Sequence, residues 1–166
     1  MKANLLLLSL TLISSIALAQ AEKAQPAPAI VPYGESITLE AAKKLANAAQ
    51  AFATGKQWTI VIAIVDTGGN LVLLEKMDNT QVGSIDVAMG KARTANNYKR
   101  PTKSFEDAIA NGGVGLRVLS LPNVIPIEGG EPILSNGKII GGIGVSGMQA
   151  TQDEEVVKAA LAVLSK

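Results

Sequence analysis

The stretch NGKIIGGIGVSGMQATQDEEV, residues 136–156, decides the fold. Asn136-Gly137 is a strong signal for a two-residue β-hairpin turn, and the apolar residues of 138–145 predict the strand that returns from it. Thr151 and Glu154 have the spacing of a capping box, so we predict that the last helix begins there. The side chains that we expect this helix to bury are Val157, Ala160, Leu161 and Leu164.

Three glycines of this stretch, Gly142, Gly144 and Gly147, spell G-x-G-x-x-G. In a dinucleotide site this motif is followed by a helix and then by a second parallel strand, which carries an acidic residue about 20 residues on. Only 19 residues follow Gly147, and the closing helix takes most of them, so we expect no dinucleotide here. We interpret the glycines instead as turn positions and as places where a neighbouring element approaches the strand closely.

Hydrophobic periodicity predicts the remaining elements. The apolar run TIVIAIV, residues 59–65, predicts a strand that is covered on both faces. We therefore predict one α/β (α+β) domain over residues 38–166, with a mainly antiparallel central sheet between helices. The other expected elements are helices over 38–55, 83–98 and 103–110, a helical turn within 114–121, and strands over 71–77, 125–128 and 132–134.

The N-terminal segment has the pattern of a secretory signal. Residues 1–19 begin with a basic residue, Lys2, continue as a short apolar run and end in Ala17-Leu18-Ala19, which a signal peptidase accepts. We expect cleavage after Ala19, a periplasmic or secreted location, and no membrane insertion of the mature protein. Residues 20–37 are rich in Ala and Pro and are interpreted as an extended linker or arm.

Composition excludes several functions. The sequence contains no cysteine and no histidine, which rules out Ser-His and Cys-His catalysis and histidine-ligated metal. Without Lys2 the domain has 14 Lys+Arg (15 minus 1) against 14 Asp+Glu, so its charge gives no reason to expect nucleic acid. We assign no catalytic residue: Ser146 is interpreted as structural, and Asp66 as a cap for its own turn.

Four segments carry a resemblance to a known family: IVIAIVDTGGNLVLLEKMD, AMGKARTANNY followed by RPT, IPIEGGEPI, and NGKIIGGIGVSGMQATQDEEV. Together they resemble the GlcG/HbpS family of haem-binding proteins, and the C-terminal domain of PduO-type proteins is similar. The resemblance implies a compact α/β sandwich, homo-oligomers and, for some members, binding of haem or a corrinoid-related ligand.

Haem binding in a chain without histidine requires another iron ligand, and tyrosine or methionine can serve. We select Tyr98 as the candidate ligand and Arg100 as a partner for the haem propionates. The other candidate cofactor-binding residues are Lys91, Thr102, Gly147 and Met148; any further metal site stays unknown. The alternatives are a core-packing role for Tyr98, a solvated helix face for Lys91, and core filling for Met77 and Met89.

The sequence thus favours a secreted or periplasmic protein that binds a small ligand, haem or a related tetrapyrrole, through residues other than histidine. Two alternatives stay open. One is an oligomeric accessory or scaffold protein, and the other is an enzyme of small-acid metabolism or haem degradation. The missing acid–base and nucleophilic side chains argue against catalysis.

Overall fold

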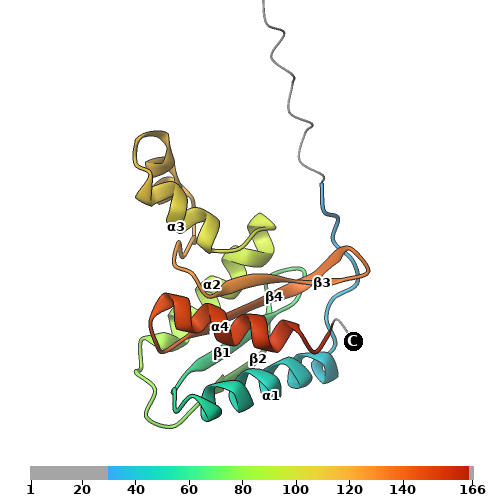
Figure 1. The fold of residues 1–166 in the computed structure, drawn as a ribbon. Helices are drawn as coiled ribbons and strands as arrows, with labels where there is room; N and C mark the ends of the chain where they lie inside the picture. The colour runs from blue at the N-terminus through green and yellow to red at the C-terminus, as the bar shows by residue number, and fades with distance from the viewer. Residues whose placement is uncertain (1–29, 165–166) are drawn as a thin grey trace, which may run out of the picture.

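The computed structural model describes residues 30–164, so the predicted signal segment lies outside the described residues. A four-stranded antiparallel sheet with the order β2-β1-β4-β3 forms the centre of the fold (Figure 1). The predicted single α+β domain with an antiparallel sheet is confirmed. Its elements are α1 (Leu39–Gly55), β1 (Val61–Val65), β2 (Leu71–Lys76), α2 (Ser84–Tyr98), α3 (Lys103–Ala110), the 3-10 helix η1 (Gly113–Ser120), β3 (Gly130–Ser135), β4 (Lys138–Ser146) and α4 (Ala150–Leu161).

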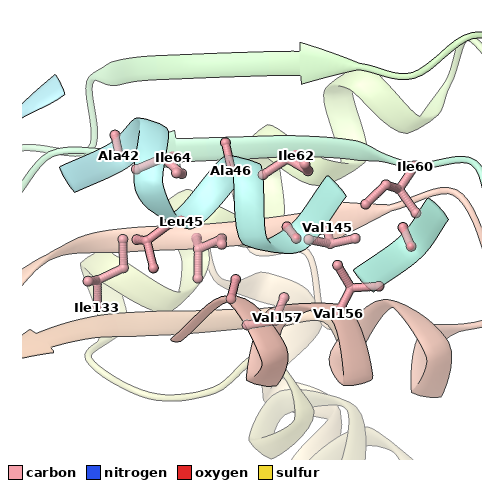
Figure 2. Close-up of a cluster of buried hydrophobic side chains, with 14 of the residues drawn as sticks. Ala42, Leu45, Ala46, Ile60, Ile62, Ile64, Ile133, Val145, Val156 and Val157 are labelled. Carbon is pink, nitrogen blue, oxygen red and sulfur yellow. The ribbon is translucent and has the colours of Figure 1, made fainter. Parts of the chain in front are cut away.

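Strand β1 is buried on both faces, as its apolar run predicts. Ile62 and Ile64, together with Ile60 just before the strand, point into the larger core, where helices α1 and α4 cover the sheet (Figure 2). Val61, Ala63 and Val65 point the other way, into a smaller core against α2. The alternation of side chains along a strand therefore divides one continuous apolar run between two helical layers.

The glycines of β4 allow α2 to pack directly on the sheet. A Cβ added at Gly144 would lie 2.2 Å from the carbonyl oxygen of Ala88, and one at Gly142 would lie 2.3 Å from that of Ala92. Both distances are far below van der Waals contact, so no side chain fits at either position. The interpretation of these glycines as close-packing positions is confirmed.

Local turn chemistry also follows the sequence. Asn136 and Gly137 both have positive φ, 49° and 71°, as a two-residue hairpin turn requires. The carboxylate of Asp66 accepts hydrogen bonds from the backbone N–H groups of Gly68 and Asn70, both at 2.8 Å. The hydroxyl groups of Ser146 and Ser84 lie 3.1 Å apart inside the protein, which agrees with a structural serine.

Two predicted elements differ from the structure. Residues 125–128 are not a strand, because side chains accept their backbone N–H groups: Ile125 N–H donates to Thr94 Oγ1 and Glu128 N–H to Glu106 Oε2. Helix α4 begins at Ala150 rather than at Thr151, and its capping residue is Gln149. The predicted Thr151–Glu154 box is wrong, since both residues lie inside the helix.

The described part of the N-terminal arm lies along its own domain. Beyond Val65, where β1 ends, the backbone of β4 is open, and Gly34 N–H and Ile37 N–H donate to the carbonyls of Ile139 and Ile140. The Tyr33 hydroxyl donates to the carbonyl of Asn96 at 2.7 Å. Residues 34–37 therefore lie beside the part of β4 that β1 does not reach, and they occupy the place that a longer β1 would take.

Candidate functional site

The candidate iron ligand Tyr98 is the last residue of helix α2 and is half-buried. Its hydroxyl donates to the carbonyl of Pro122 at 3.1 Å. Its ring meets the ring of Phe105 edge to face, with centroids 5.5 Å apart and planes at 74°. Lys99 follows with φ 56°, the left-handed conformation that ends the helix. The phenol is thus held in one orientation where α2 turns toward α3.

Arg100 lies beside Tyr98, as the sequence predicts. Its Nε donates to the carbonyl of Tyr98 at 3.2 Å, and its guanidinium carbon lies 5.4 Å from the centroid of the Phe105 ring. The side chain is otherwise exposed. An arginine whose Nε is hydrogen-bonded and whose guanidinium lies over an aromatic ring keeps its outer nitrogens available for an anion.

A pocket of about 460 Å³ connects these side chains with α3 and η1. In Figure 1 these two elements project away from the sheet and its helices. Apolar groups dominate the surface of the pocket, and its charged groups are the guanidinium groups of Arg100 and Arg117. Its lining residues are Tyr98, Arg100, Ser104, Phe105, Ala108, Val114, Gly115, Arg117, Val118 and Leu121.

Arg117 is a site residue that the sequence reasoning missed. It sits in η1, where the pattern predicts a helical turn but gives no indication of which side chains face a ligand. The signal that could have found it is a basic residue within the exposed apolar run 114–121. Ligand pockets combine apolar lining with a few placed charged groups, so Arg117 suits the lining of a small-molecule site.

Lys91 lies elsewhere and is buried. Only 1% of its surface is exposed, and its Nζ donates to Asp153 Oδ2 and to the carbonyl of Val145, both at 2.9 Å. Burial raises the pKa of the Asp153 carboxyl, and the positive charge of Lys91 opposes that rise. The interpretation of Lys91 as part of a solvated helix face is therefore wrong.

The remaining candidate residues also lie away from the pocket. Thr102 is buried, and its hydroxyl accepts from Gly130 N–H at 2.9 Å. Gly147 packs on the backbone of Thr59, and Met148 packs against the larger core. The structure thus brings Tyr98 and Arg100 together and separates them from the other four candidates.

Comparison with known proteins identifies the family. The model of the HbpS-like family, described as "Haem degrading protein HbpS-like", matches residues 37–162. The chain belongs to the HbpS-like family. Protein GlcG of Escherichia coli K12 is 37% identical over 130 residues, which cover 78% of this chain and 96% of GlcG. The sequence-based resemblance to the GlcG/HbpS family is confirmed.

Two solved structures have the same fold. A double mutant of Streptomyces reticuli HbpS matches with a TM-score of 0.73 and 31% identity, over 85% of this chain and 97% of the other. The structure described as a PduOC:heme complex matches with a TM-score of 0.70 and 28% identity, over 76% of this chain and 94% of the other. The relation to PduO is therefore confirmed as well.

Within residues 30–164, this HbpS-like chain has no group of three or more acidic side chains placed to hold a metal ion. Over the same residues, no helix has the length and apolar character that a membrane crossing needs. Among the residues that line the pocket, Tyr98 is the one of a type known to ligate haem iron.

A carboxyl pair lies at the contact of β3 with α4. Glu154 is almost completely buried, its Oε1 lies 3.4 Å from Lys158 Nζ, and its Oε2 has no hydrogen-bond partner among the described residues. Burial, followed by the neighbouring carboxyl group of Glu154, raises the pKa of Glu131 to about 8. Neither residue lines the pocket, so we treat this pair as a determinant of stability.

Proposed function

We propose that this HbpS-like protein binds haem, or a related tetrapyrrole, in the pocket between α2, α3 and η1. The observation that carries the proposal is that Tyr98, Arg100 and the apolar side of η1 surround a single pocket. The family description and the haem named in the PduOC structure support it. The pocket volume of about 460 Å³ lies within the range of known small-molecule sites.

The side chains of the pocket fit haem in three respects. Phe105, Val118 and Leu121 supply apolar surface for the macrocycle, Arg100 and Arg117 supply positive charge for the propionates, and Tyr98 supplies an oxygen ligand for ferric iron. A bound haem would bring a redox-active iron to this surface. The chain itself would orient the ring of Tyr98 through its edge-to-face contact with Phe105, and the Tyr98 oxygen would give up its hydrogen bond to Pro122 on binding iron. Helix η1 would shield one side of the ligand from water.

The chain offers a matched control, since it has two tyrosines. Tyr33 also donates its hydroxyl to a backbone carbonyl, that of Asn96, but lies outside the pocket. We expect residues 20–166 to give a saturable Soret shift with haemin, Tyr98→Phe to weaken binding at least about tenfold, and Tyr33→Phe to leave it unchanged. Equal affinities for the three proteins would contradict the assignment of Tyr98. A Met148→Leu variant should bind as the wild type does.

We propose further that residues 1–19 are removed on export and that the mature chain forms homo-oligomers. Exposed apolar side chains of η1 that do not line the pocket, Leu116 at 49% and Leu119 at 67%, support assembly. Mass spectrometry of the protein from the periplasm should give Gln20 as the first residue. A monomer by light scattering would contradict the oligomer.

Haem degradation is the second candidate, because the family description names it. A reductant added to the haemin complex distinguishes the two functions. A Soret band that persists for many hours indicates binding alone. A steady loss of the band that is absent in Tyr98→Phe indicates degradation at this site.

A further inference from the structure

A second cavity, of about 510 Å³, lies on α2 and shares no lining residue with the proposed haem pocket. Segment 121–125 separates the two, because Leu121 lines the haem pocket while residues 123–125 line this cavity. Its volume is in the range of sites for small molecules. None of the functions discussed so far uses it.

One stripe of α2 forms the base of the cavity, with Asp86, Met89, Gly90, Arg93 and Asn97 one turn after another. The facing wall is held tightly against this stripe. A Cβ at Gly90 would lie 2.3 Å from Ile125 Cγ1, and the N–H of Ile125 donates to Thr94 Oγ1 at 2.9 Å. The cavity therefore has a defined shape.

Arg93 is fixed at one end. Its Nε donates to the carbonyl of Gly69 at 3.1 Å, and among the described residues its two terminal nitrogens have no hydrogen-bond partner. Asn97, one turn along the helix, adds a side-chain amide to the same end. A guanidinium held by Nε and free at both terminal nitrogens suits two parallel hydrogen bonds to a carboxylate.

Asp86 gives the other end the opposite charge. It stands two helical turns before Arg93, about 10 Å along the axis, and makes no ion pair among the described residues. Met89 and Ile125 supply apolar surface between the two charges. A ligand with a carboxylate at both ends would meet repulsion from Asp86.

We propose that this cavity binds a short monocarboxylate whose far end carries a hydrogen-bond donor, preferably an amine. The carboxylate pairs with Arg93 and Asn97, the aliphatic chain contacts Met89, and the amine faces Asp86. The proposal is independent of haem binding, and its test contains no haem, so either can fail without the other.

The test compares three four-carbon probes, γ-aminobutyrate, butyrate and succinate, by calorimetric titration into residues 20–166. We expect γ-aminobutyrate to bind most tightly and succinate least. Arg93→Gln should weaken γ-aminobutyrate at least about tenfold, Asp86→Asn should remove its advantage over butyrate, and the matched surface variant Lys44→Gln on α1 should change nothing. No binding of any probe, a preference for succinate, or affinity unaffected by Arg93→Gln would overturn the proposal.

Arg93 also fastens the Gly69 turn, so its variant could disturb the fold. A measurement on the wild type covers this case. Amide chemical shifts should move on addition of γ-aminobutyrate at Gly69, Asn97 and residues 123–125 and stay constant in α1. Shifts centred elsewhere would overturn the assignment of this cavity.

Discussion

Replacement of Lys91 by methionine tests the buried ion pair that holds α2 to α4. The variant keeps an unbranched side chain, one atom shorter than that of lysine, and removes its charge. Asp153 Oδ2 would lose its ionic partner, the carbonyl of Val145 would lose a donor, and Asp153 would retain one hydrogen bond, at Oδ1, from Met148 N–H. Both side chains of the pair are at most 3% exposed, so water cannot replace the lost contacts without opening the fold.

The expected loss is about 3–5 kcal/mol of the free energy of unfolding, as for other buried pairs from which one partner is removed. With a urea m-value of about 2 kcal/mol/M, the unfolding midpoint should fall by roughly 2 M. Because burial already raises the pKa of Asp153, the isolated carboxyl can take up a proton, and the loss should become smaller toward acid pH.

The assay is urea unfolding of the mature protein, followed by circular dichroism. Lys44→Met is the matched control, since Lys44 pairs with Glu40 at the same distance, 2.9 Å, but in solvent, and its loss should cost less than about 1 kcal/mol. The double variant Lys91→Met/Asp153→Leu should recover part of the stability, because it removes the unpaired carboxylate but also the acceptor of Met148 N–H. A single variant as stable as Lys44→Met would refute the buried pair.

Two further predictions concern the packing of β4 and the carboxyl pair. Gly144→Ala should lower stability by about 1–3 kcal/mol, since the added methyl group would clash with the Ala88 carbonyl. The control Gly55→Ala should not lower it, because no atom lies within 4 Å of the added Cβ. Similar unfolding midpoints for the two variants would contradict the described packing of α2 on β4. Because its pKa is raised, the Glu131 carboxyl binds a proton more tightly in the folded than in the unfolded state. The free energy of unfolding should therefore be greatest below the ordinary carboxyl pKa and fall as pH rises toward about 8. Because Glu131 is only partly buried, solvent screening reduces this pH-dependent contribution to stability to about 1–2 kcal/mol. Glu131→Gln should remove this dependence, and a midpoint that stays constant between pH of about 5 and about 8 in the wild type would contradict the shift.

Local patterns predicted most of the fold. The alternating faces of Ile62 and Val61, the turn at Asn136-Gly137 and the spacing of apolar residues in α1 each depend on neighbours in sequence. The short segment 125–128 did not follow its pattern, because side chains from α2 and α3 accept its backbone N–H groups. Sequence spacing carries no information about partners of that kind.

The same limit applies to the candidate site. Tyr98 and Arg100 are neighbours in the chain, and both line the pocket. Lys91 was placed with them by sequence proximity, but its partner Asp153 is 62 positions away on another helix, so its burial could not be predicted. Arg117 lines the pocket because η1 packs against α3. This contact also depends on tertiary structure, so the sequence pattern could not predict it.

The most direct test of the proposed haem site is a map of paramagnetic broadening. Ferric haem bound to the isotope-labelled mature protein should broaden the amide signals of Val114–Leu121 and those around Tyr98. The signals of α1, which covers the opposite face of the sheet from α2, should stay sharp. Broadening centred on α1 or on the Gly147–Met148 turn, or no localised broadening at all, would contradict the account.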